Sequence, residues 1–242
     1  MSELRSELRQ ILDEETQEEA LRRRLVERLL AIPPRPPKMS FDEFIEWLDE
    51  DVHAELVDGE VVMSSPADQR HQDISLFLAS TLDLDVRSRN LGKIQIAPFQ
   101  MRLPDSSREP DLLFLANDHL HRLKPTYLDG PADLVIEILS PESIGRDRGE
   151  KFVEYESASI PEYWMIDPRA RRFEQYILND QKRFAPVLWG SSGKIQSKVI
   201  PGFWLEVEWL WQDPLPSALQ TVANIAGLDA ELLQAFEKAL RG

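Results

Sequence analysis

Hydrophobic positions recur along the chain with two different periods, so the sequence predicts both helices and strands. Leucine and isoleucine return every three to four residues over 1–31, 67–89 and 227–242, which is the spacing of amphipathic helices. A shorter helix is expected from Ser40, because Glu43 stands three residues later and completes a capping box. Runs rich in valine, isoleucine and aromatic residues predict strands; they cover 92–104, 109–117, 133–141, 161–168, 171–178, 183–190, 193–200 and 203–211.

Turn signals set the order of these elements. The pair Asp58-Gly59 joins two short apolar runs and predicts a hairpin. The polar stretch "PDSSR" (104–108) is expected to be a turn between two strands, and a further helix is expected over 143–157. The resulting order of helix, strands, helix and strands predicts an α/β fold with a central mixed β-sheet flanked by helices.

Prolines divide the chain into parts. "IPPRPPK" (32–38) ends the first helix, because proline cannot continue one. We therefore expect an N-terminal helical arm (1–31), a Pro-rich linker (32–39), a central domain (40–212) and a C-terminal helical extension (213–242), whose last helix Asp229 caps. The N-terminal arm either packs back on the body or pairs with a second copy, and we expect a homodimer.

Charge and composition narrow the function classes. The net charge of −15 argues against a protein that coats nucleic acid by bulk electrostatics. The charge is uneven, however: 38–60 hold nine acidic residues against one basic, whereas 161–200 hold four against seven. No apolar run approaches the roughly 18 residues that cross a bilayer, and the charged start is unlike a signal peptide. The absence of Cys agrees with a reducing cytoplasm.

A carboxylate stands inside one apolar strand. Glu137 lies in "DLVIEILSP" (133–141), where a bare charge is costly, and Asp111 begins the strand "DLLFLA". If these strands are antiparallel neighbours, their carboxylates converge, and a hard cation such as Mg²⁺ between them would relieve the repulsion. Lys151, on the helix that follows, could then orient or deprotonate a water, and Glu55 could be a third carboxylate.

Each of these residues also has a plainer interpretation. Glu137 fits a buried ion pair, Asp111 a turn position, Lys151 a helix-surface pair with Asp147, and Glu55 a solvated acidic face. His71 could contact a phosphate or a neighbouring acid, but the sequence favours a structural role for it. The basic stretch "PRARRF" (168–173) is either a solvated turn or a contact to a nucleic-acid backbone.

The segments "AELVDGEVVMSSPADQRHQDI", "EPDLLFL", "DLVIEILSP" and "GEKFVEYESASIPEYWMIDP" together resemble a large bacterial family of restriction endonucleases in the PD-(D/E)XK superfamily. The resemblance covers about 40–200. It implies a restriction-endonuclease-like core and Mg²⁺-dependent hydrolysis of phosphodiester bonds, with Mn²⁺ expected to substitute. It matches Asp111 and Glu137 to the two metal-binding acids, the backbone carbonyl of Ile138 to a further ligand, and Glu55 to an upstream acid.

One position departs from the superfamily pattern. The motif lysine stands two residues after the second acid, where this chain has Leu139, and the resemblance moves it to Lys151. The leading hypothesis is therefore a cytoplasmic Mg²⁺-dependent endonuclease. Its expected substrate is nucleic acid, with DNA favoured over RNA, and no contact with a membrane is expected. Two alternatives stay open: a non-catalytic interaction protein that keeps the nuclease fold, and a metal-free carboxylate-pair hydrolase acting on sugars.

Overall fold

The structure, a computed structural model, describes residues 38–49, 52–63, 67–140 and 144–241. The predicted arm (1–31) and most of the linker (32–39) lie outside these residues. Internal contacts divide the chain between Lys38 and Met39, and the description below concerns the unit that begins at Met39. Among the residues described, no helix is long and apolar enough to span a bilayer.

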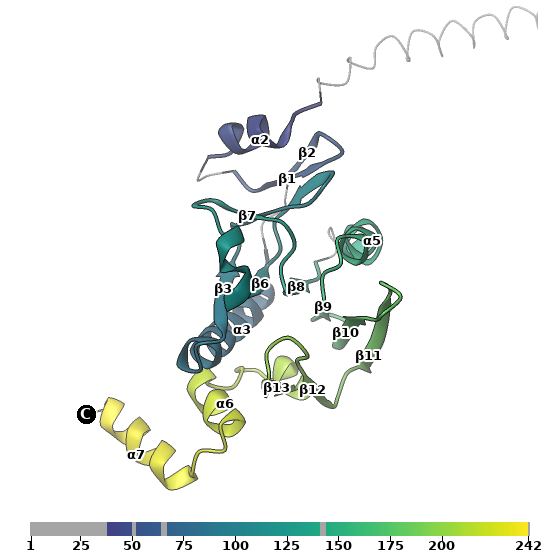
Figure 1. Ribbon diagram of the computed structural model, residues 1–242. Helices are drawn as coiled ribbons and strands as arrows, with labels where there is room; N and C mark the ends of the chain where they lie inside the picture. Colours follow the sequence, from purple (N-terminus) through teal and green to yellow (C-terminus); the bar gives the residue numbers. More distant parts are fainter. Residues whose placement is uncertain (1–37, 50–51, 64–66, 141–143, 242) are drawn as a thin grey trace, which may run out of the picture. The chain divides into compact units, whose positions relative to one another are not determined.

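The larger of the sheets has the strand order β11-β10-β9-β8-β6-β3 (Figure 1). Its strands are β3 (Gly92–Ile96), β6 (Leu112–Ala116), β8 (Leu134–Ile138), β9 (Glu162–Asp167), β10 (Arg172–Leu178) and β11 (Phe184–Gly190). β8 and β9 run parallel, whereas the other neighbours are antiparallel. The predicted central mixed sheet is therefore confirmed.

Helices α3 (Gln69–Ser88) and α5 (Glu150–Ser157) pack on the large sheet with different sets of side chains. Ile136 of β8 shares a buried cluster with Leu78 of α3. Its sequence neighbour Val135 belongs to a second cluster with Tyr155 of α5. Because successive strand residues point to opposite faces, α3 and α5 cover opposite faces of β8.

A smaller sheet, with the order β2-β1-β5-β4-β7, adjoins this core (Figure 1). Its strands are β1 (Ala54–Val57), β2 (Glu60–Met63), β4 (Gln100–Arg102), β5 (Ser106–Arg108) and β7 (Tyr127–Asp129). The hairpin at Asp58-Gly59 is present, with both residues at positive φ (49° and 79°). The capping box of Ser40 and Glu43 begins α2 (Phe41–Trp47) as predicted.

The predicted strand over 92–104 is in fact two strands in different sheets, β3 and β4. Pro98 lies between them and has no N–H to donate to a ladder. The predicted turn over 104–108 was also wrong in part, because Ser106–Arg108 form β5, which pairs with β1 and β4. The loop after β6 contains η1 (Asn117–Arg122) and β7.

The helix predicted over 143–157 is split at Gly149 into α4 (Ile144–Arg148) and α5. The predicted strand over 203–211 gives only β13 (Trp204–Glu206), which pairs with β12 (Lys194–Gln196) and is followed by η2 (Val207–Trp211). The C-terminal extension holds α6 (Ala218–Ile225) and α7 (Ala230–Arg241). Asp229 accepts from the backbone N–H of Glu231 at 2.8 Å, as its predicted role at the start of α7 requires.

Candidate active site

Asp111 and Glu137 meet across two antiparallel strands. Leu112 of β6 is the partner of Ile136 in β8, so Asp111, one residue earlier, stands beside Glu137, one residue later. Asp111 Oδ2 accepts a 2.6 Å hydrogen bond from the backbone N–H of Ile138. The antiparallel pairing on which the sequence argument depended is therefore present.

Lys151 joins three carboxylates in the interior. Its Nζ lies 2.9 Å from Glu137 Oε1 and 2.9 Å from Glu55 Oε1. Asp147 Oδ1 is 3.2 Å away, without hydrogen-bond geometry. Lys151 is only 6% exposed, so the interpretation as a helix-surface pair with Asp147 is wrong, although that contact exists.

Glu55 comes from β1 of the small sheet and is fixed from several sides. Its Oε2 accepts from Arg108 Nη1 at 3.1 Å, and its Oε1 accepts from the backbone N–H of Glu109 at 3.2 Å. At 4% exposure Glu55 is not part of a solvated acidic face. Arg108, on β5, is fully buried and also holds Glu154 of α5 through two contacts of 2.7 and 2.6 Å. The small sheet is thereby tied to α5 at the site.

Tyr155 completes the surroundings of Glu137. Its hydroxyl donates a 2.7 Å hydrogen bond to Glu137 Oε1, the oxygen that Lys151 also contacts. Lys151 and Tyr155 are four residues apart, so one face of α5 presents both side chains to β8.

The ionisation of these groups follows from burial and from an excess of acid. Burial raises the pKa of Glu137, and the nearby Asp147, Asp111 and Glu55 raise it further, against the opposing charge of Lys151. Burial alone would lower the pKa of Lys151, but the charges of Glu137, Glu55 and Asp147 raise it well above its usual value.

The pKa of Glu55 is shifted in the opposite direction from that of Glu137. Burial favours the neutral acid, but Lys151 and Arg108 outweigh it, so the pKa of Glu55 is lowered. Lys151 is therefore a cation and Glu55 an anion. Glu137 is the carboxyl of the cluster that tends to keep a proton.

His71, on the first turn of α3, contacts the Asp111 oxygen that does not accept from Ile138. The distance from His71 Nε2 to Asp111 Oδ1 is 3.1 Å. Burial lowers the pKa of His71, but its hydrogen bond and charge interaction with Asp111, the charge of Asp68 and the backbone of Ile138 outweigh burial and raise it. The sequence favours a structural role for His71 over contact with a phosphate or a neighbouring acid, whereas the structure shows contact with a neighbouring acid, the predicted metal ligand Asp111.

The donors at this site suit a hard cation. Among the described residues, no group of three or more His, Asp or Glu side chains is arranged to hold a metal ion by itself. Mg²⁺ in phosphate chemistry, however, is usually held by one or two carboxylates together with water and phosphate oxygens. Asp111 and Glu137 supply two such carboxylates, which come from neighbouring positions of β6 and β8. The residues present therefore fit Mg²⁺.

Several residues of the site were not found from the sequence. Arg108 lies in the predicted polar turn (104–108), and Tyr155 lies in the predicted helix (143–157), where neither residue stands out. A signal for Tyr155 existed, since it follows Lys151 by one helical turn. Arg108 gave no such signal, because its partners Glu55 and Glu154 are about fifty residues away in either direction.

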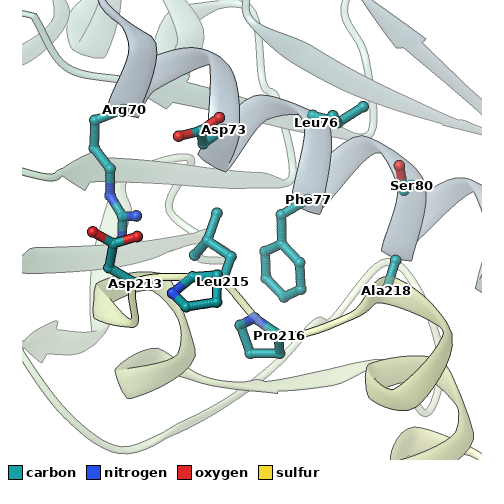
Figure 2. A pocket seen from close by; sticks show the side chains of 10 residues that line it. Arg70, Asp73, Leu76, Phe77, Ser80, Asp213, Leu215, Pro216 and Ala218 are labelled. Atoms are coloured by element: carbon teal, nitrogen blue, oxygen red, sulfur yellow. The ribbon is translucent and has the colours of Figure 1, made fainter.

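A cavity of about 390 Å³ lies elsewhere, between α3 and the segment that leads into α6 (Figure 2). Phe77, Leu215 and Pro216 contribute apolar side chains to it, and Arg70 and Asp73 lie at one end. None of the predicted catalytic residues lines it.

Comparison with known proteins places this geometry in a family. A search of curated proteins finds no match. Among solved structures, the chain is similar to the crystal structure of "a putative nuclease belonging to DUF820" from Anabaena variabilis, with a TM-score of 0.62 and 16% identity, over 72% of this chain and 97% of that one. At that identity the likeness concerns the fold. The model of the family described as "Uma2: Putative restriction endonuclease" matches residues 41–208, and the chain belongs to this family of restriction-endonuclease-like proteins.

Proposed function

We propose that this protein is a Mg²⁺-dependent endonuclease that hydrolyses phosphodiester bonds of nucleic acid, with DNA as the favoured substrate. The observation that carries the proposal is the convergence of Glu55, Glu137 and Lys151 from β1, β8 and α5, with Asp111 across the strand pair. Three separate elements bring ionisable groups into an interior where a charged form is costly unless it is paired or used. Family membership gives the reaction class.

Asp111 and Glu137 would hold the metal, with the backbone carbonyl of Ile138 as a further ligand. Mg²⁺ bound there would lower the pKa of a coordinated water and neutralise charge on the scissile phosphate. His71 and the Ile138 N–H keep the Asp111 carboxylate in place. Tyr155 keeps Glu137 in place, and Arg108 does the same for Glu55.

Lys151 acts as a cation in this proposal and not as a base. A pKa raised by three carboxylates means that Nζ holds its proton at neutral pH. It can donate to an attacking water or to a phosphate oxygen and stabilise the negative charge that develops there. The proposal therefore assigns to Lys151 the orientation of a water and not its deprotonation.

Calorimetric titration with Mn²⁺ and Mg²⁺ tests the metal without knowledge of the substrate. We expect binding to the wild type and its loss in Asp111→Ala and Glu137→Ala. Asp83→Ala serves as a matched control, because Asp83 is a half-exposed acid on α3 with an i, i+4 partner, Arg87. Cleavage of plasmid DNA and of labelled RNA should follow the same pattern, and cleavage retained in Glu137→Ala would refute the assignment.

A second candidate is a non-catalytic protein that keeps the nuclease fold. It is favoured by the fact that Lys151, Tyr155, Arg108 and His71 already satisfy the acids within the protein. In that case the wild type would bind no divalent metal, with or without oligonucleotide present. Metal binding with nucleic-acid cleavage excludes this candidate.

We also propose the homodimer, now through α7. Leu232 and Phe236, one turn apart on this helix, are 61% and 52% exposed. A second copy of α7 packed against this face would cover both apolar side chains. Light scattering should show a dimer, and Leu232→Ser/Phe236→Ser should give a folded monomer. A wild-type monomer at high concentration would refute this.

A further inference from the structure

The turn between β9 and β10 carries arginines whose charge the site does not use. It spans Pro168–Arg171, and Arg169 and Arg171 on it are both exposed. Arg169 has one ion pair, a 3.8 Å contact with the exposed Asp68, and such contacts contribute little. Arg171 makes none of the ion pairs found within the described ranges.

The next arginine along the chain differs in kind. Arg172 is only 29% exposed, pairs with Asp167 and Glu174, and lies over the ring of Trp189. Glu174 also holds Arg148 at 2.6 Å. These two arginines are neutralised inside the protein, so the available charge of the turn belongs to Arg169 and Arg171.

The topology places this turn at the edge of the sheet where the site lies. β8 and β9 are parallel, and Glu137 and Ile138 are the partners of Met165 and Ile166. The turn follows directly after Asp167, which fixes it by accepting from the backbone N–H of Ala170 at 2.9 Å. The chain therefore leaves β9 at the same edge of the sheet at which Glu137 and Ile138 end β8.

Side-chain contacts connect the turn to the site independently of this topology. Arg169 contacts Asp68, whose other oxygen accepts from the backbone N–H of His71 at 2.9 Å. The imidazole of His71 in turn contacts Asp111. Two exposed cations thus border a centre that is rich in carboxylates, in a protein of net charge −15.

An anionic polymer could not approach such a centre without local positive charge. We infer that Arg169 and Arg171 bind backbone phosphates of the nucleic acid that flank the scissile phosphate. The inference rests on the proposed nuclease function. Because phosphate contacts carry no base information, the turn should position the strand without selecting its sequence.

Steady-state cleavage by the full-length protein tests this, with a labelled duplex and a labelled single strand of mixed sequence, in Mg²⁺, at several salt concentrations. The variant is Arg169→Gln/Arg171→Gln. The control, Arg87→Gln/Lys93→Gln, removes the same charge from two exposed positions. Arg87 lies near the last residue of α3, at the end opposite to His71, and Lys93 lies near the first residue of β3. Arg169→Lys/Arg171→Lys retains the charge.

We expect KM of the glutamine variant to rise about tenfold with kcat unchanged. The slope of log(kcat/KM) against log[salt] should become shallower by about 1 to 2, since each phosphate contact contributes roughly 0.7 to 0.9. The control and the lysine variant should stay near the wild type.

Two results would overturn the inference while leaving the nuclease intact. One is a glutamine variant with the KM of the control. The other is a loss of kcat at unchanged KM, which would mean that the turn acts through Asp68 and His71 on the site. A wild type that neither binds nor cuts any nucleic acid would overturn the inference and the proposed function together.

Discussion

Lys151 Nζ lies 2.9 Å from Glu137 Oε1, although the superfamily pattern would place a lysine on the strand at position 139. Leu139 occupies that position, and its side chain is buried in the cluster that contains Tyr155 and Met165. A lysine there would lose the apolar packing of this face. The cation comes instead from α5, the helix that covers the same face of β8.

Removal of the Lys151 ammonium should lower the free energy of unfolding. Lys151→Met leaves Glu137 and Glu55 without their shared cation, and removing one partner of a buried ion pair costs roughly 3–5 kcal/mol. We expect the free energy of unfolding in urea to fall by about that amount in EDTA, with loss of nuclease activity. A second variant, Lys151→Met/Glu137→Gln, should recover part of the stability but none of the activity.

The control for this pair is Lys194→Met, since Lys194 is exposed, lies over the ring of Trp204 and has no ion pair with a carboxylate of the site. It should change the free energy of unfolding by less than about 1 kcal/mol. Equal stability of Lys151→Met and Lys194→Met would contradict the view that Glu137 and Glu55 depend on a buried cation.

The stability of the metal-free protein should depend on pH through Glu137. Its pKa is raised by burial and by neighbouring acids, so the folded state binds the proton more tightly than the unfolded state. Above the usual Glu pKa of about 4.5 the unfolded chain releases this proton first, and stability falls as pH rises towards the folded pKa. Glu137→Gln cannot ionise and lacks this loss.

Thermal unfolding in EDTA between pH 5 and pH 8 measures the difference. We expect the melting temperature of Glu137→Gln to rise relative to the wild type as pH increases, whereas Glu46→Gln, at an exposed site on α2, should follow the wild type throughout. Added Mn²⁺ should stabilise the wild type and not Glu137→Gln. Parallel pH curves for wild type and Glu137→Gln would contradict the raised pKa.

His71 should matter for activity more than for stability. It contacts Asp111 Oδ1, and loss of a residue that orients a metal ligand typically costs 10- to 100-fold in metal affinity or activity. We expect His71→Ala to lower kcat/KM by about that factor with a nearly unchanged melting temperature. His119→Ala is the control, because His119 also contacts a carboxylate, Asp133, but at the start of β8. Equal activity of the two variants would remove His71 from the site.

Local signals explain which parts of the fold were predictable. The turn at Asp58-Gly59 needs two residues that tolerate positive φ, and the start of α2 needs Ser40 and Glu43 three residues apart. Both requirements are satisfied within four residues, so the sequence shows them. Glu137 was also visible, because a charge among Val, Ile and Leu contradicts its surroundings.

Long-range packing explains what was missed. The polar letters of 104–108 are typical of a turn, yet β5 is buried because Arg108 finds Glu55 and Glu154 on elements distant in the sequence. Lys151 and Asp147 are four residues apart, a spacing that the sequence shows, although Gly149 separates their helices. Its contact with Glu55 depends on how the small sheet docks on α5, and no local pattern encodes that contact.

Arg108 should therefore be sensitive even to a substitution that keeps its charge. A guanidinium reaches both oxygens of Glu154 and one of Glu55 at the same time, and the ammonium of lysine cannot reproduce that planar arrangement. We expect Arg108→Lys to lower the free energy of unfolding by on the order of 2 kcal/mol and to reduce activity, because Glu55 loses its fixed position. Arg102→Lys, at a half-exposed pair with Asp129 in the same small sheet, should cost less than about 0.5 kcal/mol. Similar urea midpoints for the two variants would show that Arg108 does not tie the small sheet to α5.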